Sequence, residues 1–125
     1  MPDARSAEIS INQNHYQVEI ADSVEKRRLG LMHRQKLEDN HGMLLVYPNN
    51  GDHRIWMKNM LIPLTVIWIN NQFSVVEIKK ILPCAAPPCE IYSSPFASRF
   101  VLELNDGNHP IRIGDRVRGL SDLIE

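Results

Sequence analysis

The chain has 125 residues, 43% hydrophobic and 23% charged, which suffices for one buried core and excludes a disordered composition. Fourteen Lys and Arg against fifteen Asp and Glu give a formal net charge of -1, so the overall charge does not predict binding to nucleic acid or to an anionic membrane. The most apolar window, 55–69, is interrupted by Lys58, Asn59 and Pro63 and falls short of the roughly 18 apolar residues of a transmembrane helix.

The first part of the chain predicts a β-hairpin followed by a short helix. Apolar residues alternate with polar ones over 9–11 and 16–20, on either side of an Asn-Gln-Asn turn. Asp22 or Ser23 can cap a helix whose apolar side chains fall at helical spacing from Val24 to Met32.

The middle of the chain predicts several strands separated by turns. The apolar run 43–47 is typical of a buried strand, which we expect Pro48 to end before a loop at 49–52. Segments 54–60 and 64–69 have strand composition, and the Asn-Asn pair after the second predicts a hairpin turn into 73–78.

The last third of the chain begins with a segment that cannot be regular structure, because 83–89 contains three prolines. A strand over 100–104, a turn over 105–108 and one or two short strands within 111–117 follow.

These elements predict a mainly β fold, either an antiparallel β-sandwich or a partly closed barrel with one short helix. We expect the strands to be joined by turns rather than by strand–helix–strand crossovers. The whole chain, 1–125, is predicted to form a single domain, with 7–14 and 118–125 peripheral to the core pattern.

A series of short blocks runs through most of the chain. In order they are Arg-x-x-Gly-Leu-Met-x-Arg at 27–34, Gly-Met-Leu-Leu-Val-Tyr at 42–47, Trp-Met-Lys-Asn-Met-Leu-Ile-Pro-Leu at 56–64, Val-Leu-Glu-Leu at 101–104 and Gly-Asp at 114–115. From about 18 to 117 the chain resembles the bacterial and archaeal family called domain of unknown function 192, from whose usual residues it departs at Leu29, Met60 and Thr65. The resemblance implies a small, mostly β domain and says almost nothing about activity. It also implies a periplasmic or cell-envelope location, with a cytoplasmic location left open.

The candidate site centres on Lys58, which lies between apolar neighbours. On an extended backbone, Trp56, Lys58 and Met60 would share one face of a strand. Because burying an unpaired ammonium costs several kcal/mol, we expect Lys58 to pair with Glu103 or Asp115, or to reach into a cleft. The competing interpretation is a lysine with a purely structural role, snorkelling or fixing the fold through an ion pair.

The hypothesis that follows is a binding or accessory module for a small polar, anionic or sugar-like ligand. Its predicted ligand-binding residues are Trp56, Lys58, Asn59, Arg34 and Glu103. One alternative is a small hydrolase or lyase that uses Lys58 with Glu103 or Asp115, although no catalytic residue is assigned. Another is a protein–protein interaction domain of the cell envelope, which predicts an exposed apolar patch instead of a cleft. The partner is thus a small molecule or a protein of unknown identity, and not nucleic acid.

Cys84 and Cys89 are predicted to form a disulfide in an oxidising compartment, closing a six-residue loop for about 2 kcal/mol of stabilisation. The pair lacks the spacing of thioredoxin-like redox sites, and the five histidines lack paired metal spacing, so we predict no metal and no cofactor. The methionines near the histidines are expected to pack in the core. The basic run over 26–36 is expected to form a solvated helix face.

Overall fold

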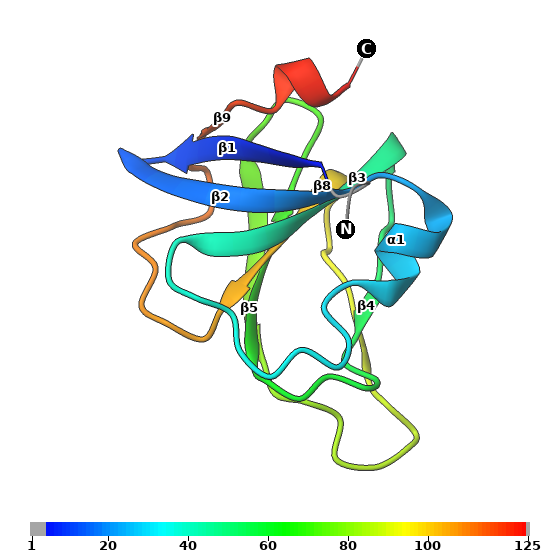
Figure 1. The fold of residues 1–125 in the computed structure, drawn as a ribbon. Helices are drawn as coiled ribbons and strands as arrows, with labels where there is room; N and C mark the ends of the chain where they lie inside the picture. The colour runs from blue at the N-terminus through cyan, green and yellow to red at the C-terminus, as the bar shows by residue number, and fades with distance from the viewer. Residues whose placement is uncertain (1–4, 125) are drawn as a thin grey trace.

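The structure, a computed structural model, describes residues 5–124. Nine strands dominate it, with one α-helix and one turn of 3₁₀-helix (Figure 1). In chain order the elements are β1 (Ser6–Ile11), β2 (Asn14–Ala21), α1 (Val24–Leu29), β3 (His41–Gly51), β4 (Ile55–Trp56), β5 (Leu64–Ile69), β6 (Val75–Ile81), β7 (Ile91–Tyr92), β8 (Ser98–Asn105), β9 (Val117–Arg118) and the 3₁₀ turn Ser121–Leu123.

Seven of the strands form one curled sheet in the order β6-β5-β8-β3-β2-β1-β9, while β4 and β7 form a separate pair. The segment 114–117, which leads into β9, also bonds to the start of β6. Val75 N–H donates to the Asp115 carbonyl at 2.9 Å, and Gly114 N–H donates to the Val75 carbonyl at 2.8 Å. These bonds join the two edges of the sheet at one end, which confirms the prediction of a mainly β, partly closed barrel.

The connection between β2 and β3 differs from the prediction. These two strands are parallel, whereas every other strand pair is antiparallel. The expectation that turns alone join the strands is therefore wrong here. A parallel return needs a connection of a dozen or more residues. Helix α1 and the loop that follows it supply this length.

Apolar residues fill both faces of the curled sheet. The inside of the barrel is packed by side chains that include Ile9, Ile11, Tyr16, Ile67 and Phe100. Segment 7–14, expected at the periphery, thus contributes two side chains to this core. The outer face carries a second cluster, which includes Leu31, Leu45, Met57, Val66 and Trp68 and lies under the segments 30–37 and 55–62.

Several turns and strand ends differ from their predicted positions, while one turn is confirmed. The hairpin at 12–13 is confirmed, and both of its turn residues have positive φ, as such tight turns require. Strand β3 continues through Pro48, which the sheet accepts because the β3–β8 register shifts between Val46 and Gly51. The turn after β5 is wider than predicted, because the Asn70 side chain accepts hydrogen bonds from the backbone of Gln72 and Ser74.

The predicted strand over 54–60 is mostly wrong. Only Ile55–Trp56 is a strand, paired with β7. The chain then turns, with Asn59 at φ 61° and Met60 N–H donating to the Met57 carbonyl at 3.2 Å. Met57 and Met60 are buried, while Trp56, Lys58 and Asn59 point outward. The alternation argument for Lys58 therefore fails, because the backbone is not extended there.

Candidate ligand-binding site

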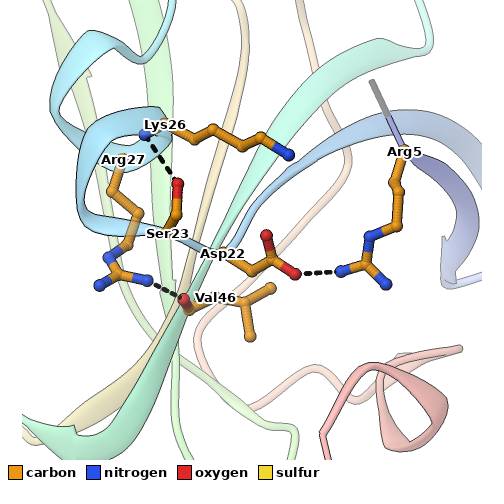
Figure 2. Close-up of polar contacts among 6 residues, drawn as sticks. All are labelled: Arg5, Asp22, Ser23, Lys26, Arg27 and Val46. Carbon is orange, nitrogen blue, oxygen red and sulfur yellow. Dashed lines mark hydrogen bonds and ion pairs between the residues drawn. The ribbon is translucent and has the colours of Figure 1, made fainter. Parts of the chain in front are cut away.

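Helix α1 is held to the sheet by polar contacts, and none of its residues is buried. Ser23 caps it as predicted, since its hydroxyl accepts from Lys26 N–H at 3.1 Å. Arg27 Nη1 donates to the Val46 carbonyl of β3 at 2.8 Å, and Asp22 pairs with Arg5 just before the helix (Figure 2). The Arg27 guanidinium also lies 5.0 Å from the Tyr47 ring centroid, so this side chain fixes the helix against β3.

The loop after α1 is tied to the turn that contains Lys58 and Asn59. His33 N–H donates to the Asn59 carbonyl at 2.9 Å, and the Asn59 amide lies 3.9 Å from the Met32 sulfur. These contacts hold the loop after α1 against the turn that follows β4, and α1 and β4 lie near each other in Figure 1.

Two hollows lie between these segments. The first has a volume of about 190 Å³ and is lined by Arg27, Arg28, Leu29, Gly30, Met32, Leu45, Tyr47, Arg54, Ile55, Trp56 and Glu103. The second has a volume of about 330 Å³ and is lined by Glu25, Arg28, Leu29, Met32, Trp56, Lys58 and Asn59. Arg28, Leu29, Met32 and Trp56 belong to both, so the hollows adjoin. We call them the carboxyl hollow and the indole hollow.

Glu103 of β8 is the buried acid of the carboxyl hollow. It is 5% exposed, and its Oε1 has no hydrogen-bond partner among residues 5–124. Burial raises its pKa to about 7, because the charged form is poorly solvated there. A Cβ at position 30 would lie 3.7 Å from Oε1, so the Gly30 backbone stands close to the carboxyl group.

Tyr47 forms another part of this hollow and is held by stacking on His53, with ring centroids 3.6 Å apart. The pKa of its hydroxyl is raised to about 12, first by burial and then by the negative charge of Glu103. The hydroxyl therefore stays protonated at neutral pH and can act as a hydrogen-bond donor.

The cationic side chains around the two hollows differ in their hydrogen bonds and ion pairs. Arg27 is bound to Val46, and Arg54 pairs with Asp52 at 3.0 Å. The Arg28 side chain has no hydrogen bond or ion pair with any residue in 5–124, although it lines both hollows. Lys58 Nζ lies 5.2 Å from the Trp56 ring centroid and has no ion pair within the described residues. Both cations are therefore available to an incoming anion.

The structure brings some of the predicted site residues together. Trp56, Lys58 and Asn59 line the indole hollow, and Glu103 lines the adjoining carboxyl hollow with Trp56. Arg34 lies elsewhere, because its guanidinium forms a two-point ion pair with Glu19, at 2.5 and 2.8 Å. This pairing lowers the pKa of Glu19 through the hydrogen bond from Arg34.

The expected partners of Lys58 are not found. No ion pair between Lys58 and Glu103 or Asp115 exists among the described residues, and the lysine is exposed. Asp115 instead serves as a turn former, since its Oδ2 accepts from Arg112 N–H at 2.7 Å and from Asn12 at 2.6 Å. The expected Lys58–carboxylate pair is therefore absent among residues 5–124, and Lys58 instead lines the indole hollow.

The sequence interpretation missed Arg28 and Leu29, because it assigned the basic run to a solvated helix face. It also missed Tyr47 and Arg54, which it placed in strands without a site role. One signal in the sequence could have indicated the site. Leu29 is an apolar residue at a helix position that does not share the face of the other apolar residues.

Cys84 and Cys89 lie at disulfide-bonding distance, with Cα atoms 5.6 Å apart. Among residues 5–124, no group of three or more His, Cys, Asp and Glu side chains could hold a metal ion. No helix in the described part of the chain has the length and apolar character needed to cross a membrane.

The fold and the hollows define a small curled-sheet β domain with a buried acid beneath a short helix on its outer face. The chain belongs to the family of domain of unknown function 192, described as "Uncharacterized ACR", whose sequence profile matches residues 7–119. No curated protein matches the chain.

Two solved structures are similar to this one. A Sinorhizobium meliloti 1021 protein, assigned provisionally as a transcription regulator, is 26% identical with a TM-score of 0.85, over 93% of this chain and 95% of that one. A protein of unknown function from Novosphingobium aromaticivorans DSM 12444 is 24% identical with a TM-score of 0.84, over 91% of this chain and 85% of that one. The second likeness shows a shared fold.

Proposed function

We propose that the protein is a binding module for a small anionic ligand, whose charged group enters the carboxyl hollow. The observation that carries the proposal is that an acid and a cation line the same hollow and neither is bonded within residues 5–124. The acid is Glu103, whose buried Oε1 has no hydrogen-bond partner there, and the cation is the Arg28 side chain. Neither group is satisfied by the described part of the fold. A ligand that accepts hydrogen bonds from both would satisfy them together.

The charged side chains of the carboxyl hollow favour an anionic ligand over a cationic one. Three arginines line the carboxyl hollow against one carboxyl group, which carries its proton over much of the neutral range. A cationic ligand would be repelled by Arg28 and Arg54, whereas an anion would be attracted. A ligand carboxylate would also accept a hydrogen bond from protonated Glu103.

Size limits the ligand. A volume of about 190 Å³ corresponds to roughly six water molecules at their liquid volume of about 30 Å³ each. Drug-sized pockets run to about 300–1,000 Å³. The carboxyl hollow therefore takes a small anion or the charged end of a longer molecule.

The test is a calorimetric titration with acetate, succinate, inorganic phosphate and glucuronate. Arg28→Ala should weaken the binding of the preferred anion about tenfold or more, because a charge-assisted hydrogen bond contributes about 1.5–3 kcal/mol. Arg118→Ala, an exposed arginine of β9, is the matched control and should bind like the wild type. Equal affinities in wild type and Arg28→Ala, or no binding of any anion, would contradict the proposal.

The pH profile gives a second readout. Anion binding should weaken as the pH rises through about 7, since Glu103 then ionises and repels the ligand. Glu103→Gln should bind with an affinity that is nearly independent of pH over this range. A wild-type affinity that does not change with pH would exclude Glu103 from the site.

A small hydrolase or lyase is the second candidate, and one observation favours it. A carboxyl group with a pKa of about 7 in a concave site is suited to general acid–base catalysis. Lys58 lies by the indole hollow without a bond to Glu103, so the proton transfer would fall to Glu103 alone. Turnover of a bound anion that disappears in Glu103→Gln, while binding persists, would favour the enzyme over the binding module.

The location proposed is an oxidising compartment of the cell envelope. The Cys84–Cys89 pair supports this, because disulfides persist in such compartments and are rare in the cytosol. The transcription-related description belongs to the Sinorhizobium meliloti protein, and the net charge of -1 of this chain does not favour nucleic-acid binding.

A further inference from the structure

We propose that the ligand is an amphipathic carboxylate, whose carboxylate lies between Arg28 and Glu103 and whose apolar body lies along Trp56 in the indole hollow. This inference rests on the proposed function and names its ligand class more closely. The proposed ligand class includes fatty-acid-like and other apolar carboxylates and excludes sugar acids.

Three of the seven residues that line the indole hollow are apolar. Leu29, Met32 and Trp56 line it, and Leu29 and Trp56 keep 57% and 44% of their surface exposed. Large side chains exposed at a concave site lose water when an apolar group covers them, which favours binding in proportion to the area covered. A sugar would leave its hydroxyl groups against these walls without partners.

The polar groups of the indole hollow lie in positions that match an anion with an apolar body. Asn59 directs its amide nitrogen toward the Met32 sulfur at 3.9 Å. Arg28 and Lys58 add positive charge to the same hollow against the single acid Glu25. An apolar cation is thereby disfavoured, and an apolar anion is favoured.

The two hollows are connected through the residues that they share. Arg28, Leu29, Met32 and Trp56 line both, so a ligand whose carboxylate reaches Glu103 can continue along the indole without leaving the protein surface. A third hollow, lined by Arg54, Ile55, Trp56 and Ile91, opens on another side of Trp56. Arg28 and Met32 do not line that one, so we assign the ligand body to the indole hollow.

The experiment is a titration with a series of straight-chain carboxylates, acetate, butanoate, hexanoate and octanoate, against the folded full chain. Affinity should rise by about fourfold for each methylene group that enters the hollow, and then level off when the hollow is filled. Met32→Ala and Trp56→Ala should each flatten this dependence on chain length. Ile91→Ala, which truncates an exposed side chain of the third hollow, should leave it as in the wild type.

The outcomes separate this inference from the proposed function. If acetate or glucuronate binds through Arg28 but affinity does not grow with chain length, the apolar body is wrong and the anion-binding module stands. If alkylammonium ions bind with the same length dependence and Arg28→Ala has no effect, the anion-binding proposal fails and the inference falls with it. If Ile91→Ala flattens the series while Met32→Ala does not, the assignment to the indole hollow is overturned.

Discussion

The replacement Glu103→Gln tests the buried acid directly, through the pH dependence of protein stability. Glu103 has a pKa of about 7 in the folded state, against an ordinary value of 4.5. Below pH 4.5 both states carry the proton, so the group contributes no pH dependence to the free energy of unfolding. Between pH 4.5 and about 7 the folded state binds more protons than the unfolded state, so stability falls as the pH rises.

The size of the loss follows from the two pKa values. Each pKa unit corresponds to 1.36 kcal/mol, so the wild type should lose about 3 kcal/mol through Glu103 by the time the pH exceeds 7. This is a large share of the stability of a domain, which is typically about 5–15 kcal/mol. Glutamine has nearly the same shape and no charge, so the variant should lack this loss.

The assay is urea denaturation of wild type and Glu103→Gln across this pH range, with the difference in unfolding free energy plotted against pH. The difference should grow in favour of the variant between pH 4.5 and 7 and then become constant. Glu38→Gln, at an exposed position, is the control and should run parallel to the wild type. A constant difference between wild type and Glu103→Gln would show that the carboxyl is solvated in the folded protein, and the description of the hollow would be wrong.

Three further changes test other parts of the fold. Thr65→Val should raise the free energy of unfolding by about 1 kcal/mol in urea denaturation, because the Thr65 hydroxyl is buried without a hydrogen-bond partner in the described part of the chain; a decrease would show that it is bonded. Cys84→Ser should lower the free energy of unfolding by about 2 kcal/mol under oxidising conditions and leave it unchanged in reductant. Thiol titration of the unreduced wild type should find no free thiol. Gly42→Ala should cost about 3 kcal/mol, since its Cβ would lie 2.4 Å from the Glu103 carbonyl oxygen, whereas Gly51→Ala meets nothing closer than 3.8 Å and should be tolerated.

The strands could be predicted where the apolar pattern is bounded by residues that stop a strand. Strand β5 has the predicted limits, because a run that is apolar except for Thr65 lies between Pro63 and Asn70. Strand β3 runs beyond its predicted end, because a shift of register lets the sheet accommodate Pro48. Such a shift depends on the partner strand, which local sequence does not specify.

The candidate site could be predicted only where its residues are neighbours in sequence. Trp56, Lys58 and Asn59 share one short segment, and they do line one hollow. Arg28 and Leu29 were missed because α1 buries no residue and is held by its cap and by Arg27, so no amphipathic pattern reveals which side faces the sheet. The meeting of Glu103 with Arg28 depends on the β3–β8 pairing and on the crossover after β2, which were not foreseen.

Glu103 and Glu19 differ in how the fold compensates their negative charge. Arg34 bonds Glu19 at two points and lowers its pKa, so ionisation of that carboxyl is favourable in the folded state. Glu103 receives no such compensation on Oε1, and its ionisation costs stability. Glu103 lies on the outer face of the sheet, among the apolar side chains that cover β8. An apolar residue of similar volume would fit this position and would carry no cost of ionisation. Under the proposed function, the acid and Arg28, which has no side-chain partner among residues 5–124, would both be satisfied by a bound anion.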